Sequence, residues 1–496
     1  MLTVLALAAA VLVINRIDVY FSAIFAFSGD IYLFRMMGRS TRRGGEVGKG
    51  FPAILLVAFV PMGFGAMLSA LGYFGSLQEA ILRTALMTGF SIALLVSTFP
   101  LPLALRFKML EGKAPKGTGM KPLVTVLVPA FNEQSVLSRT IESLKNSDYD
   151  RIEIIVIDDG STDLTASIAT WYKEHGVKVI RQPNGGKAAA LNHGLLYAKG
   201  EFLITLDSDS MVSRTAIDEV IRLMETDPET SAVAGNVKVL NNKSVLTRVQ
   251  ELEYIMALNT IRRAYALFGT VMVIPGAFGA FRKSAVVLEK GYDRDTVTED
   301  FDLTVRLLKK HGTIASSSSG VVYTEVPSTL KGLYKQRMRW NTGTFQTVYK
   351  HRDALWNKEF QNLHSVGFPL ILLSLFNPFA SFLSIVAGVI LAATGQWVIF
   401  LEMVGIFLLA QIFVALAAIS IDGEDYRLVS YAPLFVVGYR QFNDFVTILA
   451  AVSTISGRGR AWNKLARTGG TGAIRLSGGV RKSSGAGQAQ GQTSVD

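Results

Sequence analysis

The sequence predicts an α/β domain with a mostly parallel sheet, inserted between two blocks of apolar helices. Half of the 496 residues are hydrophobic, and they concentrate in residues 1–106 and 366–455, whereas residues 107–360 have an ordinary soluble composition. The mean hydropathy of +0.34 is too high for a purely soluble protein. In the central part, apolar runs alternate with segments of helical spacing, and several of the runs end in carboxylates. Such a chain has room for more than one domain.

The first apolar block predicts about three helices within residues 1–106. Residues 51–75 and 82–105 are long enough to cross a membrane, which takes about 20 residues. Residues 2–27 are apolar but carry a polar notch at Arg16. The part before the notch is too short to cross alone and could be a signal-peptide core, but no basic segment precedes it and no clear cleavage site follows. We expect this first helix to be retained.

Charge predicts the orientation of the chain. A basic segment, residues 28–50, lies between the first two apolar helices, and loops rich in lysine and arginine stay in the cytoplasm. The central domain, residues 107–327, follows two crossings later and is therefore predicted to be cytoplasmic. The net charge of +11 suits anionic lipid or an acidic substrate. Nucleic acid is disfavoured because no basic-aromatic array is present, and the absence of cysteine excludes disulfides and thiolate metal sites.

The central domain alternates strands and helices. Strands are predicted at residues 124–128, 152–157, 177–180 and 203–206, and helices at residues 135–145, 164–175 and 187–198. Strands separated by helices of this length predict βαβ units and a parallel sheet. Two more strands, residues 233–239 and 271–275, are expected to extend the sheet, with a helix at residues 246–268 between them.

The second apolar block begins after an interfacial region, residues 328–360. Residues 328–349 predict a basic amphipathic helix lying at the membrane surface. In the C-terminal membrane block, residues 361–455, two membrane spans are predicted, at residues 368–393 and 397–420. Residues 428–455 contain two short apolar runs, and either a re-entrant hairpin or an extra crossing would keep the basic tail inside. Residues 456–496 are basic at first and then rich in glycine and serine, which predicts a disordered tail.

Two acids follow the strand at residues 203–206. Asp207 and Asp209 come directly after this apolar run, at the carboxyl edge of the predicted sheet, where open α/β folds bind ligands. Acids at this spacing can share a divalent cation, and Mg²⁺ often sits between carboxylates and substrate phosphates. The alternative is a solvated turn after a strand.

Two further loops suggest a nucleotide site. After the first strand, the loop with Pro129, Asn132 and Glu133 can cup a nucleotide base, or it can be an ordinary strand-to-helix connection. Asp158 and Asp159 end the second strand and are expected to reach into the crevice, where a carboxylate can bind uracil or ribose. The alternative role of that segment is helix capping by Ser161 or Thr162, and both roles can hold at once.

Lys187 follows two glycines and opens a helix. This arrangement resembles a phosphate cradle, although the spacing is not that of a P-loop. A glycine turn with a solvated lysine is the alternative. Further on, Glu299 and Asp300 precede an amphipathic helix at residues 303–310. A carboxylate in that place is either a helix cap or a general base positioned by the helix.

Gln336, Arg339 and Trp340 lie on one face of the predicted amphipathic helix, because residues three and four apart are neighbours. The arginine suits a diphosphate, since it is always charged and offers a forked set of donors. The indole can pack against a sugar ring. The alternative is anchoring to lipid headgroups.

These motifs together resemble a known family. In order, the chain carries Asp-Asp-Gly-Ser at residues 158–161, Gly-Gly-Lys at 185–187, Asp-Ser-Asp at 207–209, Thr-Glu-Asp at 298–300 and Gln-x-x-Arg-Trp at 336–340. The series is similar to that of the membrane-embedded family 2 glycosyltransferases, which include cellulose, chitin, hyaluronan and poly-N-acetylglucosamine synthases. The resemblance covers residues 120–355 closely, and the flanking helices and residues 462–467 loosely. Residues 235–239, 246–254 and 275–282 look most like the poly-N-acetylglucosamine synthase branch, with hyaluronan synthases next.

The resemblance implies a GT-A-like fold with a Rossmann-like half and a processive, inverting transferase. It would polymerise a sugar, best N-acetylglucosamine, from a UDP-sugar into a β-linked polysaccharide and pass the polymer through its own membrane helices. It further implies a multi-pass protein of the cell membrane with a cytoplasmic catalytic domain. Its partners would be the lipid bilayer and, where one exists, an accessory membrane subunit.

Residue by residue, the resemblance assigns uridine binding to Asp158 and Asp159 and places Lys187 near the nucleotide. Asp207 and Asp209 would hold Mg²⁺ or Mn²⁺ on the diphosphate. Asp300, beside Glu299, would be the catalytic base. The diphosphate and the acceptor end would be bound by Gln336, Arg339 and Trp340.

Two other functions fit parts of the sequence. Ceramide glucosyltransferases, which add one sugar to a lipid, resemble the same motif set, including its Arg-Trp ending. A non-catalytic export scaffold on an inactive transferase fold would have lost a carboxylate of the motifs, and this chain has lost none.

Overall fold

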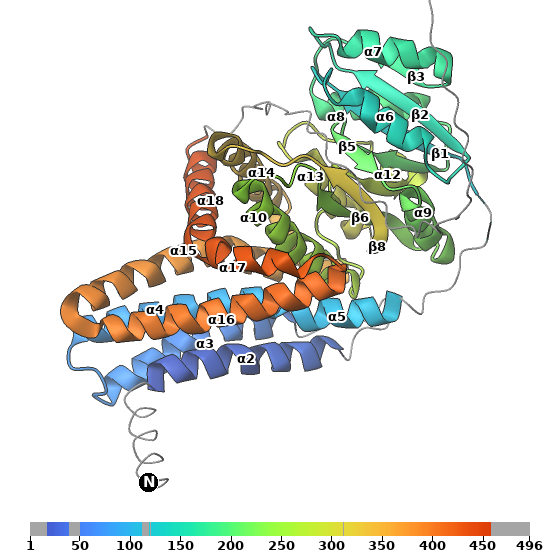
Figure 1. The fold of residues 1–496 in the computed structure, drawn as a ribbon. Helices are drawn as coiled ribbons and strands as arrows, with labels where there is room; N and C mark the ends of the chain where they lie inside the picture. The colour runs from blue at the N-terminus through green and yellow to red at the C-terminus, as the bar shows by residue number, and fades with distance from the viewer. Residues whose placement is uncertain (1–16, 39–49, 112–118, 120, 311, 458–496) are drawn as a thin grey trace, which may run out of the picture.

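The computed structural model describes residues 17–38, 50–111, 119, 121–310 and 312–457. Figure 1 shows two parts, an α/β domain built around a sheet and a set of long helices beside it. The predicted helical residues 2–16 and the tail from residue 458, with the motif at 462–467, lie outside the described residues.

The α/β domain contains an eight-stranded sheet in the order β3-β2-β1-β4-β7-β6-β8-β5. Its strands are β1 (Val124–Ala130), β2 (Ile152–Asp158), β3 (Lys178–Arg181), β4 (Phe202–Thr205), β5 (Ser210–Val212), β6 (Thr230–Val239), β7 (Gly279–Arg282) and β8 (Thr313–Thr324). Strands β1 to β4 pair in parallel, as the alternation predicts. However, β7 is antiparallel to both β4 and β6, and β5 is antiparallel to β8. The sheet is therefore mixed rather than mostly parallel.

Helices cover both faces of the sheet, which explains the continuous apolar strands. On one face, α6 (Leu137–Lys145) and α9 (Ala216–Thr226) pack with Val126 and Val128 into one core. On the other face, α8 (Lys187–Tyr197) and α13 (Glu299–Lys309) pack with Leu127 into a second core. Alternate residues of a strand point to opposite faces, so all seven residues of β1 are buried.

Two predicted elements differ from the structure. Residues 271–275 form no strand, and the strand that pairs there is β7, a few residues later. The predicted helix at 246–268 consists of α10 (Val245–Glu253), a π-helix (Tyr254–Asn259) and α11 (Thr260–Ala266). The smaller helices of the domain are α7 (Thr165–Trp171), a 3₁₀ turn (Tyr172–His175) and α12 (Lys283–Leu288).

The long helices come from both ends of the chain. They are α2 (Ile17–Gly38), α3 (Gly50–Ala70), α4 (Leu77–Thr98), α5 (Pro100–Glu111), α15 (Phe368–Leu391) and α16 (Trp397–Asp422). Because α2 extends to Gly38, part of the segment expected as a basic loop is helical. Two stretches, Leu77–Glu111 and Leu363–Asp422, are long and apolar enough to cross a membrane. Length and composition alone are weak evidence of crossing, since core helices of soluble proteins also meet this test.

Helix α14 (Leu330–Lys350) joins the two parts and packs against α18 (Arg440–Ile455). Short helices follow α14, at Arg352–Leu355, Lys358–Phe360 and Leu363–Gly367. The segment in front of α18 consists of Tyr426–Tyr431, α17 (Ala432–Leu434) and Phe435–Tyr439. Val437 and Gly438 leave helical geometry there, so the chain turns between the two apolar runs of residues 428–455.

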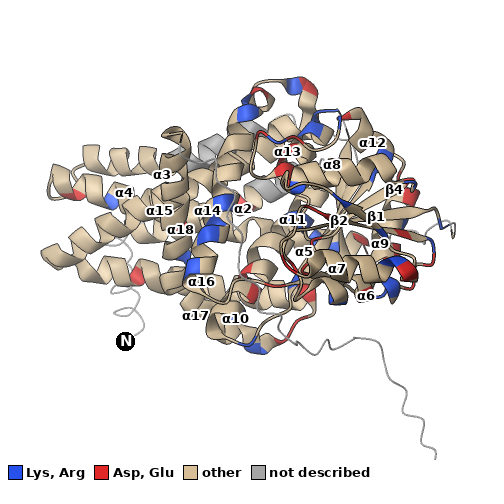
Figure 2. Cartoon of the chain, turned by 90° about the horizontal axis from the view of Figure 1, so that it is seen from above, with Lys and Arg blue, Asp and Glu red and all other residues tan. Residues whose placement is uncertain are grey.

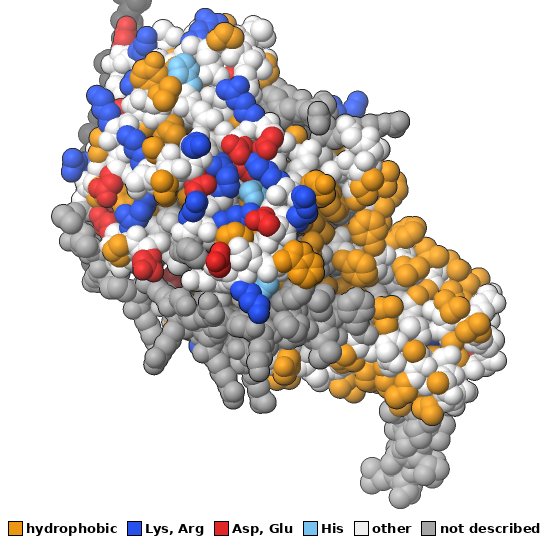
Figure 3. Space-filling model, turned by 180° about the vertical axis from the view of Figure 1, so that it is seen from behind, with side chains coloured by type: hydrophobic (Ala, Val, Ile, Leu, Met, Phe, Trp, Pro, Cys, Tyr) orange, Lys and Arg blue, Asp and Glu red, His pale blue; other side chains and the backbone are white. Residues whose placement is uncertain are grey.

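The surfaces of the two parts differ in charge. Charged residues are frequent along the α/β domain, whereas α3, α4 and α15 carry few of them (Figure 2). Figure 3 shows hydrophobic side chains spread over the helical part. Phe376, Leu409 and Phe413 are each more than half exposed. Monomeric soluble proteins rarely expose an apolar surface of this extent.

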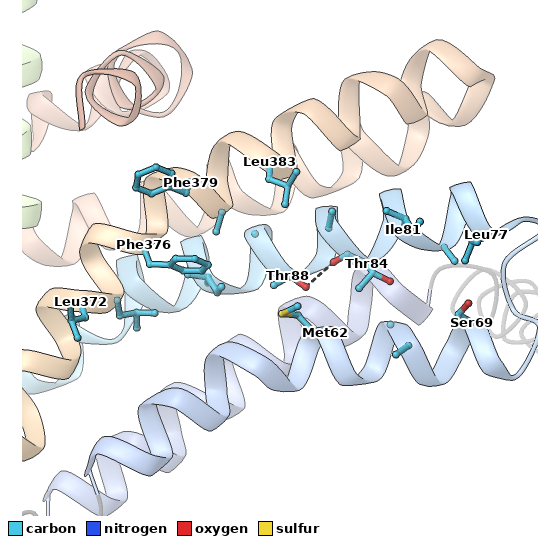
Figure 4. A pocket seen from close by; sticks show the side chains of 18 of the residues that line it. Met62, Ser69, Leu77, Ile81, Thr84, Thr88, Leu372, Phe376, Phe379 and Leu383 are labelled. Atoms are coloured by element: carbon cyan, nitrogen blue, oxygen red, sulfur yellow. Dashed lines mark hydrogen bonds between the residues drawn. The ribbon is translucent and has the colours of Figure 1, made fainter. Parts of the chain in front are cut away.

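The helical part also contains an apolar groove of about 720 Å³ between α3, α4 and α15 (Figure 4). Phe376, Phe379 and Leu383 line it from α15. Its polar side chains are hydroxyls, such as Thr88, which donates to the Thr84 carbonyl at 2.7 Å. Among the residues that the structure describes, no titratable side chain lines the groove, so these residues do not offer the groups that catalysis needs.

Candidate active site

Two joined cavities lie at the sheet edge where the sequence places its acids. The main cavity, about 370 Å³, is bounded by the loop after residue 272, α13, α14 and the π-helix–α11 segment. The side cavity, about 100 Å³, is bounded by the loops after β1 and β2. Lys187, Asp207, Asp209 and Arg339 line both cavities, so these four side chains mark the junction.

Asp207 and Asp209 lie in the short segment that follows β4, as expected for acids at a sheet edge. Asp207 Oδ1 lies 2.5 Å from the Lys187 amine. Asp209 is buried, and its Oδ1 accepts hydrogen bonds from Ser210 Oγ at 3.2 Å and Thr324 Oγ1 at 3.3 Å. The second bond ties Asp209 to β8, which sequence patterning did not predict as its neighbour.

Lys187 begins α8, and its amine reaches into the junction. Besides Asp207, it lies 3.4 Å from Glu299 Oε1. Burial alone would lower the pKa of Lys187, but Asp207, Glu299 and Asp300 raise it above its usual range. The lysine is therefore a fixed positive charge in the site, and the alternative of a solvated lysine is wrong.

Glu299 and Asp300 are the first two residues of α13. Asp300 Oδ2 accepts from the Gly276 amide at 3.1 Å, and Oδ1 accepts from the Phe301 amide at 2.8 Å. Burial and the neighbouring Glu299 charge raise the pKa of Asp300 to about 6, against the opposing effect of Lys187. A carboxylate with such a pKa can take up a proton near neutral pH.

The predicted nucleotide residues divide into two groups. Pro129, Glu133 and Asp159 line the side cavity. Asp159 accepts from the Gly185 amide at 2.9 Å and the Gly186 amide at 2.8 Å, so it holds the glycine loop that leads to Lys187.

Asp158 and Asn132 line neither cavity. Asp158 is fully buried, and its Oδ1 accepts from the Ser161 amide at 3.2 Å. Asn132 Oδ1 accepts from the Thr162 amide at 2.7 Å. Both side chains therefore order the loop after β2. The expectation that Asp158 reaches into the crevice is wrong, and so is capping by Ser161 or Thr162, because α7 begins later, at Thr165.

Gln336, Arg339 and Trp340 all line the main cavity, which confirms that they share one face of α14. Their neighbour Arg337 supports them from behind. The Arg337 guanidinium lies 4.3 Å from the centre of the Trp340 ring and 2.5 Å from Glu253 Oε2. Tyr439 donates to the same Glu253 oxygen at 2.6 Å. The indole is thus held by contacts to both α10 and the segment before α18.

The donor set at the junction suits a hard divalent cation. Asp207 and Asp209 present carboxylate oxygens to the space that the two cavities share, and Mg²⁺ or Mn²⁺ prefers oxygen ligands. A second acidic cluster, Asp293, Asp295 and Asp302, has the right spacing for a metal. Its centre is taken by the Lys350 amine, which lies 2.7–2.9 Å from all three carboxylates, so that cluster is an ion-pair network.

Gly276 and Arg262 are among the residues of the main cavity that sequence reasoning missed. Gly276 packs against the Lys187 amine and donates to Asp300. Arg262 of α11 also lines this cavity. Residues 275–282 carry a family resemblance in the sequence but no sign of this contact, and nothing in the helical pattern of residues 246–268 marks Arg262.

The mixed sheet, the acids at its edge and the buried carboxylate beside a cation suit a glycosyltransferase domain. Residues 125–287 match the family described as "Glycosyl transferase family 2". The chain therefore contains a family 2 glycosyltransferase domain, and it is similar to poly-β-1,6-N-acetyl-D-glucosamine synthases.

The relatives make this similarity specific. The synthase of Staphylococcus aureus (strain COL) is 34% identical over 252 residues, which cover 50% of this chain and 60% of the relative. The synthase of Staphylococcus epidermidis is 31% identical over 277 residues, 54% of this chain and 66% of the relative. The match thus spans less than two thirds of these relatives' length.

A solved structure shares the fold. The mannosyltransferase PcManGT from Pyrobaculum calidifontis, in complex with GDP-Man and Mn²⁺, aligns with a TM-score of 0.51 at 20% identity. The alignment covers 75% of this chain and 99% of that chain. At this identity the likeness shows the GT-A-like fold.

Proposed function

We propose that this protein is a processive, inverting glycosyltransferase that polymerises N-acetylglucosamine from UDP-N-acetylglucosamine into a β-linked polysaccharide. The observation that carries the proposal is the pair of joined cavities with Asp300 at their side. The side cavity suits a nucleotide, the junction suits its diphosphate, and the main cavity has room for the sugar and an acceptor. The similarity to poly-β-1,6-N-acetyl-D-glucosamine synthases supports the choice of sugar.

In the proposed reaction, an acceptor hydroxyl attacks the anomeric carbon of the donor sugar. A new bond forms between that carbon and the acceptor oxygen, the bond to the diphosphate oxygen breaks, and the hydroxyl proton goes to Asp300. A single displacement of this kind inverts the configuration. The raised pKa of Asp300, caused by burial, suits a group that must accept a proton near neutral pH.

Charge on the departing diphosphate is balanced by residues at the junction. Lys187 and Arg339 offer positive charge there, and preorganised charge of this type usually contributes more to catalysis than any other single effect. Asp207 and Asp209 would hold Mg²⁺ or Mn²⁺, which neutralises diphosphate oxygens when bound. Gln336 and Trp340 would contact the acceptor end.

The helical part would serve as the polymer's route across the cell membrane. The main cavity reaches Ile371 and Ser374 of α15, which belongs to the long apolar stretch Leu363–Asp422. The exposed phenylalanines and leucines of α15 and α16 suit a lipid bilayer. On this basis residues 1–106 and 361–455 are membrane blocks around a cytoplasmic domain, residues 107–327, with residues 328–360 at the interface. An accessory membrane subunit remains compatible with this arrangement.

Product analysis tests the proposal. The purified protein is incubated with a panel of labelled UDP-sugars and a divalent cation, and the product is sized and analysed by mass spectrometry. A β-linked N-acetylglucosamine polymer is the expected product. Label found only in a chloroform-soluble glycolipid would replace the polymerase with a lipid glycosyltransferase.

A catalytic variant separates an enzyme from a scaffold. Asp300→Asn removes the proposed base and leaves the nucleotide residues in place, so turnover should be lost while UDP still binds. Normal turnover of this variant would contradict the role of Asp300.

A further inference from the structure

One side of the α10–α11 segment faces the main cavity with polar groups that catalysis does not use. The segment is interrupted by the π-helix Tyr254–Asn259, and single π-turns are rare and often found at functional sites. Tyr254, Leu258, Arg262 and Tyr265 from this segment line the cavity. The segment therefore presents two phenol rings and a guanidinium to the same space as Asp300.

Arg262 differs sharply from its neighbour Arg263. Arg263 is 2% exposed, forms an ion pair with Asp422 and donates to Ser318 Oγ at 3.0 Å. Arg262 is 9% exposed, and within the described part of the chain its one hydrogen bond is to Asn259 Oδ1 at 3.3 Å. Among the residues that the structure describes, no carboxylate lies within ion-pair distance of it. Burying a charge without partners costs free energy. A ligand with acceptor oxygens would satisfy the guanidinium N–H groups of Arg262 that have no partner within the described residues.

Arg262 keeps its charge under ordinary conditions. Burial lowers its pKa to about 10, while Tyr254 and Asp300 act in the opposite direction. At neutral pH the guanidinium is therefore protonated and offers only donors.

The two tyrosines complete the surface. Neither the Tyr254 hydroxyl nor the Tyr265 hydroxyl has a hydrogen-bond partner within the described part of the chain, and both rings line the cavity. A phenol offers an apolar ring with a polar tip, which suits the apolar faces and hydroxyl edges of sugars. Charged donors on one residue and ring faces on two others favour a polar, oxygen-rich ligand.

The position of Arg262 distinguishes the acceptor from the donor. Lys187, Asp207, Asp209 and Arg339 line both cavities, whereas Arg262 lines the main cavity alone. A nucleotide in the side cavity would therefore place its diphosphate at the shared residues and away from Arg262. The space beside Arg262 continues toward α15 instead, where Ile371 and Ser374 line it.

We propose that Arg262, with Tyr254 and Tyr265, forms a subsite for the saccharide acceptor, in which the guanidinium donates to hydroxyl or acetamido oxygens of the sugars behind the one being extended. This inference rests on the proposed function, because it assigns the acceptor of that reaction. It makes Arg262 a binding residue whose loss weakens the hold on the acceptor and leaves the donor site intact.

The test compares Arg262→Gln, Arg262→Lys and Tyr265→Phe with the full-length protein in detergent. The probe is a soluble β-linked N-acetylglucosamine oligosaccharide, and its dissociation constant is measured by equilibrium binding in the presence of UDP. Arg262→Gln should raise this constant about tenfold, since hydrogen bonds to a charged group are stronger than those between neutral groups. Arg262→Lys should recover part of the lost oligosaccharide affinity, because lysine restores the positive charge but not the forked donors of the guanidinium. Tyr265→Phe should raise the dissociation constant by a smaller factor.

Donor binding provides the internal check. The KM for the UDP-sugar and the affinity for UDP should stay within about twofold of the wild type in all three variants, which also proves that they are folded. Arg214→Gln is the control, because Arg214 is an exposed residue that pairs with Asp148 and lines neither cavity. Polymer made by Arg262→Gln should be shorter, since a weakly held chain leaves sooner.

Two outcomes overturn the inference. One is an unchanged oligosaccharide affinity in Arg262→Gln. The other is a raised KM for the UDP-sugar with unchanged oligosaccharide affinity, which would make Arg262 a donor residue. Failure of the proposed function looks different: the wild type would then make no polymer from any UDP-sugar, while the binding comparison would still decide the role of Arg262.

Discussion

Gly276 lies directly against Lys187, and a side chain at position 276 would overlap the lysine amine. The same glycine donates its amide to Asp300 Oδ2 at 3.1 Å. One residue without a side chain therefore lets the cation and the proposed base approach each other at the junction of the two cavities.

Replacing this glycine should impair catalysis more than stability. In Gly276→Ala, the methyl group would push the Lys187 amine away from Asp207, because the end of a lysine moves more easily than backbone. We expect kcat/KM to fall by about tenfold or more, which corresponds to about 1.4 kcal/mol of transition-state stabilisation. The measurement is steady-state kinetics with the UDP-sugar, together with thermal unfolding. Gly405→Ala is the matched control, since a Cβ there meets nothing within 4 Å. Wild-type rates in Gly276→Ala would contradict the role of this contact.

The pH dependence of the reaction should report Asp300. The pKa of Asp300 is raised by burial and by Glu299 from 3.8 to about 6, so the carboxylate that accepts the proton is lost as pH falls through about 6. We expect log(kcat/KM) to drop by about one per pH unit below that value, because kcat/KM reports the free enzyme. Glu299→Gln removes the charge that raises the pKa, and it should move this limb to lower pH. A flat profile down to pH 5 would exclude Asp300 as the base.

Binding of the divalent cation should depend on Asp207 and Asp209 and not on the acidic cluster that contains Asp293. Asp207→Asn or Asp209→Asn should abolish the thermal stabilisation that Mn²⁺ and UDP together give the wild type, because bound ligands stabilise the folded state by mass action. Asp293→Asn should leave this stabilisation unchanged, since Lys350 occupies the centre of its cluster. Thermal shift with and without chelator measures both effects. A lost shift in Asp293→Asn alone would move the metal site to that cluster.

The sequence predicted much of the site because parallel strands end at one edge. The run before Asp207 and the run before Asp159 both became strands of the parallel half, so their acids met as expected. The helical spacing of Gln336, Arg339 and Trp340 correctly predicted that they share one face of a helix, and all three line the main cavity. The prediction that Asp158 reaches into the crevice was wrong because consecutive residues at a strand end point to opposite sides. Asp158 and Asp159 therefore cannot both face the crevice.

What could not be predicted depends on contacts between distant segments. Strand β7 lies between β4 and β6 in antiparallel pairing, and this pairing holds the 272–278 loop with Gly276 against the site. The direction in which Arg262 points depends on the π-helix before it, which adds a residue to a helical turn. No local sequence pattern predicts such an extra residue. Both features follow from tertiary packing rather than from local propensity.

The ion pair between Arg263 and Asp422 should couple the α/β domain to the long helices. It joins α11 to the end of α16, and its side chains are 2% and 0% exposed. Asn236 Nδ2 and Asn259 Nδ2 also donate to Asp422, each at 3.1 Å. Removing one partner of a buried pair leaves an uncompensated charge, which costs about 3–5 kcal/mol. Arg263→Met should therefore lower the midpoint of thermal unfolding of the protein in detergent by several degrees.

The double variant Arg263→Met/Asp422→Leu should recover much of that loss, because apolar residues of similar volume often replace a buried ion pair without a net penalty. A double-mutant cycle on the unfolding midpoints measures the coupling. Lys309→Met is the comparison, since its pair with Asp353 is solvent-exposed on the carboxylate side, and exposed pairs contribute about 0–1 kcal/mol. Equal effects of Arg263→Met and Lys309→Met would show that the contact between α11 and α16 does not depend on this buried pair.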